Sequence, residues 1–251
     1  MATLYSKCPK CAAESAGLDV CAACGLIFAK YLRAKFAPPE PRRRRAEEEP
    51  DEDGLIARAK ELAFYVPEQV DPMLVYGRAI LLVAIVFYGV KLALMDIPSW
   101  GMASSLIHLP MVPIHEFGHV LFRPFGEFMT LLGGSLFQVL LPLIFGGVFL
   151  VKNRDPFAAS VMLWWAAVAV MDVAPYIYDA AKPQHVLLTG RTGDNGAHDF
   201  IDVLGDLGLL HKAQPIGRGV HAFGALTMIT ALAWGAWLVW QQHHRSKSST
   251  T

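Results

Sequence analysis

The hydropathy of the chain alternates between long apolar stretches and short polar segments over most of its length. Five apolar stretches of about 20 residues each are separated by charged residues, prolines and glycines. They cover residues 73–95, 100–122, 129–151, 157–178 and 220–240. A helix of about 20 apolar residues can cross the hydrocarbon core of a bilayer. The pattern therefore predicts a mainly α protein, namely a polytopic helical membrane protein of about five spans.

The composition agrees with this prediction. Of the 251 residues, 54% are hydrophobic, and the mean hydropathy of +0.36 is too high for an ordinary soluble domain. The formal net charge of zero gives no electrostatic reason to expect a nucleic-acid partner. The N-terminus lacks the apolar core of a cleavable signal peptide. The lipid bilayer is thus the first partner that the sequence predicts.

All four cysteines lie near the N-terminus in two Cys-x-x-Cys pairs, Cys8 with Cys11 and Cys21 with Cys24. Two such knuckles that face each other form a tetrahedral four-thiolate zinc site. Two disulfides or a redox pair are the alternatives, but disulfides require an oxidising compartment. The pattern resembles the zinc-ribbon family, which implies a structural zinc ion and a surface that binds a protein partner or a neighbouring domain.

Residues 37–72 join this module to the first apolar stretch and are rich in proline and charge. Arg42 to Arg45 form a basic run, and an acidic cluster follows it. Such a segment is typical of a charged linker, here with a candidate amphipathic surface helix at residues 55–66. The expected order is a zinc ribbon, a charged linker with a surface helix, a membrane domain and a polar tail, at residues 1–36, 37–72, 73–240 and 241–251.

The second apolar stretch contains the polar residues that carry the most chemical information. Residues 113–119 read Pro-Ile-His-Glu-Phe-Gly-His, so that His115, Glu116 and His119 form a His-Glu-x-x-His motif. On a helix the two histidines share one face and can bind one zinc ion, while Glu116 acts on a metal-bound water. A catalytic zinc site usually has three protein ligands, so one more ligand must come from elsewhere. The alternative is a polar patch, which is costly to bury without partners.

Three segments of the membrane domain resemble the site-2 protease family of intramembrane zinc metalloproteases. The first is the His-Glu-Phe-Gly-His segment, and the second is Gly133-Gly134, which is similar to the glycine-containing start of the family's next helix. The third is Asp172 to Asp179, which is similar to the family's Asn-x-x-Pro-x-x-x-Leu-Asp-Gly motif. The resemblance implies that Asp179 is the third zinc ligand. It also implies that Gly133, Gly134 and Gln138 bind the substrate as an extended strand.

The sequence leaves the third ligand open among several residues. Asp172 stands where the family has Asn, and the spacing to Asp179 is one residue shorter than in the family. His198 and Asp199 follow a Gly-Asp-Asn-Gly segment that is also typical of an ordinary turn. Glu127 follows the second histidine of the motif by eight residues. Any of these four residues could replace Asp179 as the ligand.

The charges predict an orientation. Zinc thiolates and the basic run favour a cytoplasmic N-terminus, in a multi-pass protein of the cell's inner membrane. With five spans, the second span then runs inward and places His115 and His119 near its cytoplasmic end. Under this scheme Lys152, Arg154 and the tail lie outside, so the positive-inside rule is obeyed only in part.

The resemblance implies a zinc-dependent intramembrane endopeptidase with one catalytic and one structural zinc ion. Its substrates would be membrane-embedded or membrane-proximal proteins. One alternative is a non-proteolytic membrane adaptor or scaffold with structural zinc sites, and another is a metal-dependent enzyme that acts on lipid. Glu116 separates the adaptor from the enzymes, because a structural zinc site does not need a base.

Overall fold

The computed structural model describes residues 6–15, 18–36, 52–187, 190–193 and 198–248. Two compact units make up the chain, Met1–Glu52 and Asp53–Thr251. The basic run Arg42 to Arg45 lies outside the described residues. The described residues are mainly helical, as the hydropathy pattern predicts.

The N-terminal unit consists of two turns followed by helix α1 (Phe28–Phe36). Antiparallel bridges pair residue 7 with residue 14 and residue 20 with residue 27, so each bridge frames one Cys-x-x-Cys pair. Gly25 closes the second turn with a φ of +71°, a value at which a side chain would be strained. The side chain of Phe28 is buried beside Cys8 and Cys21. This arrangement is consistent with the predicted zinc ribbon.

The second unit begins within α2 and contains all the long helices of the described chain. The helices are α2 (Glu52–Ala63), α3 (Pro72–Ala93), α4 (His108–Phe122), α5 (Glu127–Val151), α6 (Pro156–Asp179), α7 (Asp199–Asp206) and α8 (Ala213–Ser248). Helices α3, α5, α6 and α8 are the ones in the described chain that are long and apolar enough to cross a membrane. The protein is thus a membrane protein with four candidate spans, and α8 continues through most of the predicted polar tail.

The expected span at residues 100–122 needs correction. The structure divides this stretch into a 3-10 helix, Gly101–Ser104, and α4. Helix α4 has 15 residues. At a rise of about 1.5 Å per residue such a helix is about 22 Å long, which is short of the ~30 Å hydrocarbon core. Pro110 lies in the first turn of α4, where its missing N–H costs no hydrogen bond. Because α4 is too short to cross the membrane, α5 starts at the same end of the bundle at which α3 stops.

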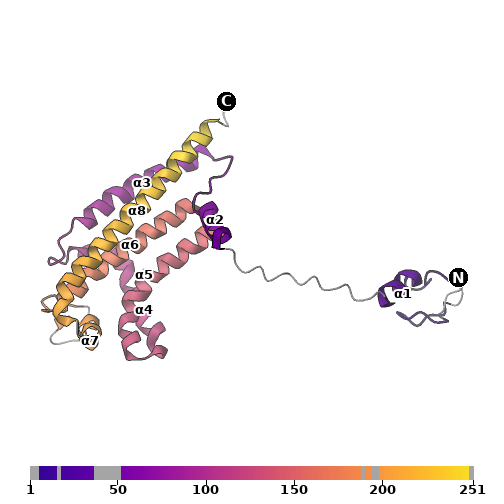
Figure 1. The fold of residues 1–251 in the computed structure, drawn as a ribbon, viewed down its shortest axis with the longest axis horizontal. Coiled ribbons are helices and arrows are strands. Elements are labelled where there is room, and N and C mark those ends of the chain that lie inside the picture. Colours follow the sequence, from indigo (N-terminus) through magenta and orange to yellow (C-terminus); the bar gives the residue numbers. More distant parts are fainter. Residues whose placement is uncertain (1–5, 16–17, 37–51, 188–189, 194–197, 249–251) are drawn as a thin grey trace. The chain divides into compact units, whose positions relative to one another are not determined.

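The two ends of the bundle differ in what they hold. Helices α3, α6 and α8 run beside one another (Figure 1). At one end, Arg78 near the start of α3 donates to Asp155 before α6 at 2.6 Å, and Arg245 near the end of α8 donates to the carbonyl of Val66. At the opposite end lie α4, α7 and the start of α5 (Figure 1).

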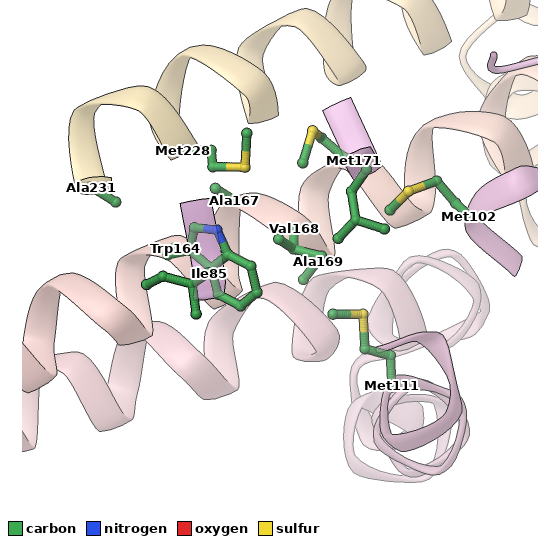
Figure 2. Close-up of a cluster of buried hydrophobic side chains, with 11 residues drawn as sticks. Ile85, Met102, Met111, Trp164, Ala167, Val168, Ala169, Met171, Met228 and Ala231 are labelled. Carbon is green, nitrogen blue, oxygen red and sulfur yellow. The ribbon is translucent and has the colours of Figure 1, made fainter. Parts of the chain in front are cut away.

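Helix α6 is the centre of the bundle. Of the 18 consecutive residues that are most apolar in each candidate span, 67% are buried in α6, compared with 11% in α3, 22% in α5 and 28% in α8. Trp164 and Met171 of α6 belong to a buried cluster that also contains Ile85 of α3, Met228 of α8 and Met111 of α4 (Figure 2). Side chains from four helices therefore meet in one cluster around α6.

Small residues allow α6 and α8 to approach closely. Glycines 217 and 224 of α8 lie seven residues apart and face alanines 174 and 167 of α6. A Cβ on Gly224 would lie 2.9 Å from the Ala167 carbonyl oxygen, and one on Gly217 would lie 2.8 Å from that of Ala174. Close van der Waals packing of this kind drives helix association in a membrane, because the hydrophobic effect does not favour contact between helices over contact with lipid.

Replacing Gly224 tests this contact. Gly224→Ala is expected to lower the free energy of unfolding by about 1–3 kcal/mol, because the new methyl group meets the backbone and Met171 of α6. Gly219→Ala on the same helix is the matched control, because nothing lies within 4 Å of its Cβ position. The control is expected to gain up to about 1 kcal/mol from helix propensity. Thermal or denaturant unfolding in detergent measures both, and equal shifts would contradict the packing.

Candidate metal centres

The four cysteines of the N-terminal unit form one cluster. The Sγ atoms of Cys8 and Cys24 are 3.6 Å apart, and those of Cys11 and Cys21 are 3.7 Å apart. All four sulfurs lie within 4.8 Å of one another, and no two are joined by a disulfide. Tetrahedral zinc with Zn–S bonds of about 2.3 Å places its sulfurs ~3.8 Å apart. The cluster can therefore hold one metal ion as the spacing predicts, and its four cysteines are free in the structure.

The electrostatics of the cluster also favour a cation. Burial raises the pKa of the Cys8 thiol, but the backbone N–H groups of Lys10 and Cys11 lower it more, to about 6. The backbone N–H of Leu26 lowers the pKa of Cys24, yet burial and the neighbouring sulfurs raise it well above its usual range. Crowded thiolates repel one another, so a metal ion is what lets all four ionise.

The second cluster lies at the α4 end of the membrane unit. His115 and His119 of α4 and Asp199 at the start of α7 form a group whose ligand atoms lie within 4.8 Å of one another. Asp199 Oδ2 is 3.3 Å from His115 Nε2 and 3.4 Å from His119 Nε2. Two imidazoles and one carboxylate are the donor set of many catalytic zinc sites. The structure thus brings the two histidines of the motif together with a ligand from elsewhere in the chain.

Gly134 of α5 makes room for this group. A Cβ on Gly134 would lie 2.7 Å from His115 Nε2 and 2.6 Å from His119 Nε2. Next to it, a Cβ on Gly118 of α4 would lie 2.4 Å from the carbonyl oxygen of Gly133. Both Gly133 and Gly134 are buried between the two helices. The predicted role of these glycines in substrate binding stays a prediction, while their visible role is to let α5 lie against the histidines.

Each histidine is oriented by a hydrogen bond to its other ring nitrogen. His119 Nδ1 lies 2.8 Å from the carbonyl oxygen of Thr130, which can only accept, so Nδ1 carries the proton. His115 Nδ1 lies 3.2 Å from Oε1 of Gln138. With Nδ1 bonded in this way, each ring turns its Nε2 toward the shared position, next to Asp199. A metal ion bound there would displace the Nε2 proton and take its lone pair, as in metal-binding histidines whose other nitrogen is hydrogen-bonded. Gln138 is 4% exposed, so it contacts a ligand histidine rather than lining a surface open to substrate.

Asp199 is held by α6. Its backbone N–H donates to the hydroxyl of Tyr176 at 3.1 Å. Phe200 and Val203 of α7 pack in a buried cluster with Val173 and other residues of α6. Burial raises the pKa of the Asp199 carboxyl, but hydrogen bonds to the two histidines outweigh it and hold this pKa well below its usual range. Asp199 is therefore anionic, the form that binds a metal.

The assignment of Asp179 as third ligand is corrected to Asp199. Asp179 Oδ1 accepts a hydrogen bond from the backbone N–H of Gln184 at 3.0 Å. Its Oδ2 lies 3.9 Å from Nε2 of His198, which is buried beside it. The side chain thus faces the loop that follows α6 and not the histidines of α4.

Asp172, His198 and Glu127 lie outside the metal group as well. Asp172 is bonded to His108 and Gln138. His198 stacks on the ring of Tyr176, with centroids 4.3 Å apart. Glu127 is exposed at the start of α5. Of the residues that the sequence leaves open for the third ligand, Asp199 is the one that meets both histidines.

Glu116 lies next to the group and is exposed. The hydrogen bond to Asp199 raises the pKa of His119 to about 9 against the effect of burial, and the negative charge of Glu116 adds to the rise. Glu116 is therefore near enough to act on the site electrostatically. Its side chain does not belong to the candidate ligand group, which offers three ligands with Glu116 beside them.

No protein-family model matches the chain, and no match is found among curated proteins or among solved structures. A function is therefore inferred from the geometry of the two clusters.

Filling the space at Gly134 tests the second cluster. Gly134→Ala is expected to lose the metal of the membrane unit, because the added methyl group would overlap both Nε2 atoms. Gly147→Ala on the same helix is the control, since nothing lies within 4 Å of its Cβ position. Metal content per chain, measured on purified protein, should fall by one equivalent in the first variant only. A second full equivalent of metal in the Gly134→Ala chain would show that the metal does not bind between His115, His119 and Asp199.

Proposed function

We propose that the protein is a zinc-dependent intramembrane endopeptidase with a second, structural zinc ion in its N-terminal ribbon. The proposal rests on a group of three candidate metal ligands with the carboxylate of Glu116 beside it. His115, His119 and Asp199 would hold the catalytic zinc, and Glu116 remains outside the ligand set. A structural zinc site usually has four protein ligands and needs no base, whereas a catalytic site keeps one position open.

The proposed chemistry is hydrolysis of a peptide bond. Zinc held by these three ligands would lower the pKa of a bound water and polarise the substrate carbonyl. Glu116 takes the proton of the attacking water and returns it to the amine nitrogen of the leaving peptide, so that the C–N bond breaks with protons in balance. Gln138 and Thr130 hold the two imidazoles in the tautomer that binds metal.

The surroundings of α4 support a substrate that comes from the membrane. Leu109, Phe117 and Val120 of α4 are large apolar side chains with more than half of their surface exposed. In a membrane protein such a face meets lipid or a transmembrane segment. Because a helix hides its peptide bonds, a substrate helix must unwind locally to reach Glu116. We propose a membrane-embedded or membrane-proximal protein as the substrate, with the ribbon binding a partner or the substrate itself.

The four-span arrangement also supports an orientation. Lys152 and Arg154 lie between α5 and α6, at the end of the bundle where α3 begins and α8 ends. Arg245 and Lys247 of α8 lie at that end as well. The basic residues that conflict with a five-span scheme thus lie on the same side as the start of α3, which favours a cytoplasmic location for that end. At the opposite end lie Arg123, Lys182, Arg191 and Lys212. We propose that the end where α3 begins is cytoplasmic, in a cell's inner membrane, and that the metal centre opens at the opposite face.

Replacing Glu116 tests the function. Glu116→Gln keeps the size of the side chain but removes the proton acceptor, so cleavage of a co-reconstituted membrane protein should fall by at least ~10²-fold while both zinc ions are retained. Glu127→Gln removes an exposed carboxylate from the same end of the molecule and is the control, with activity expected to be unchanged.

Unchanged cleavage by the Glu116→Gln variant would remove this residue from the mechanism. Retained zinc without cleavage by the unaltered protein, across a panel of membrane substrates, would favour the adaptor with structural zinc.

Thiol labelling tests the orientation. Ser99→Cys lies beyond α3 at the α4 end, and Asn153→Cys lies between α5 and α6; both positions are exposed. In a chain whose four native cysteines are changed to serine, an impermeant maleimide should label position 99 in intact cells. Position 153 should be labelled only after the membrane is opened. The reverse pattern would place the metal centre on the cytoplasmic face.

A further inference from the structure

A carboxyl group is buried inside the bundle, toward the end where α4 lies. Asp172 lies in α6, the most buried span, and its side chain is 4% exposed. An ionisable side chain at such a place is costly unless it is fully partnered, and it usually serves a function. Its two oxygens are both used: Oδ1 lies 2.9 Å from His108 Nδ1, and Oδ2 lies 2.9 Å from Gln138 Nε2. Asp172 thus links α6 to α4 and to α5.

The hydrogen bonds of Asp172 fix which way the Gln138 amide points. An ionised carboxylate only accepts, so Gln138 must turn its NH₂ group toward Asp172. Its Oε1 then faces His115 Nδ1 at 3.2 Å and can only accept from it. His115 must therefore carry its proton on Nδ1, which leaves the Nε2 lone pair for the metal.

The tautomer of His119, the second histidine of the group, does not depend on the orientation of an amide. His119 Nδ1 is bonded to a backbone carbonyl, that of Thr130, which cannot donate in any orientation. A side-chain amide is different, because rotation by 180° exchanges its donor for its acceptor. With the NH₂ group toward His115, Nδ1 would have to accept and Nε2 would carry the proton, which blocks metal binding. A carboxylate behind Gln138 prevents that exchange.

We propose that Asp172 is a positioning residue that selects the metal-binding tautomer of His115 by orienting Gln138. His108, in the first turn of α4, completes the arrangement by donating to the other oxygen of Asp172. One carboxylate in α6 thereby sets both the place of α4 and the proton of its first ligand. The inference rests on the metal centre of the proposed function but not on peptide hydrolysis.

A double-mutant cycle tests this link. The affinity for Zn²⁺ is measured on the full chain by chelator competition, with the cysteine site as an internal reference. Asp172→Asn keeps the shape of the side chain but gives Gln138 a donor to face, so the amide loses its fixed orientation. Gln138→Leu removes the contact altogether. Each change is expected to weaken the membrane-unit site by about 10–100-fold, as loss of an outer partner of a ligand does.

The combination of the two changes decides between positioning and general stabilisation. If Asp172 acts through Gln138, Asp172→Asn has no further effect on zinc affinity in the Gln138→Leu chain. Equal losses in both backgrounds, or no loss from Asp172→Asn alone, would overturn the proposal. Asp155→Asn, which removes a carboxylate bonded to Arg78 at the other end of the bundle, is the control and should leave the affinity unchanged.

A second variant keeps the test valid if Gln138→Leu does not fold. Exchanging the two groups, Gln138→Glu together with Asp172→Asn, places the carboxylate directly against His115 Nδ1 and the amide behind it. This pair can hold the same tautomer, so zinc affinity should return to within about threefold of the unaltered chain. An affinity as low as that of Asp172→Asn alone would contradict the proposed role.

Discussion

Polar groups buried in an apolar bundle must be paired with one another or with a cation, and this requirement organises the membrane unit. Its buried carboxylates are gathered with histidines at one end, where α4, α5, α6 and α7 meet. Asp172 reaches His108 and Gln138, and Asp199 reaches His115 and His119. The apolar crossing of α6 with α8 supplies the rigid support on which those partners depend.

The two candidate metal centres differ in a way that corresponds to different roles. The cysteine cluster provides four ligands from a short, turn-rich unit, so a metal there would be enclosed and would hold the fold together. The membrane-unit cluster provides three ligands from two helices that are far apart in the sequence. Its remaining side lies next to Glu116, whose carboxylate is exposed. Chemistry on a bound substrate requires an open position of that kind.

Periodicity and motif spacing predicted much of this structure. The apolar stretches correspond to α3, α5, α6 and α8, and both the cysteine cluster and the pairing of His115 with His119 were expected from local spacing alone. The third ligand was harder, because Asp179 and Asp199 are both aspartates near the end of a helix. Only the packing of α7 against α6 brings Asp199 to the histidines. Hydropathy alone predicts a span at residues 100–122, because it does not reveal that the helix in this stretch is only 15 residues long.

We propose that the membrane unit binds zinc through two imidazoles and one carboxylate. X-ray absorption at the zinc edge measures this directly on the full chain in which Cys8, Cys11, Cys21 and Cys24 are changed to serine. One zinc ion per chain is expected, with nitrogen and oxygen neighbours at about 2.0–2.2 Å, imidazole scattering and no sulfur. A chain that binds no zinc once the cysteines are gone, or zinc without imidazole neighbours, would contradict the proposal.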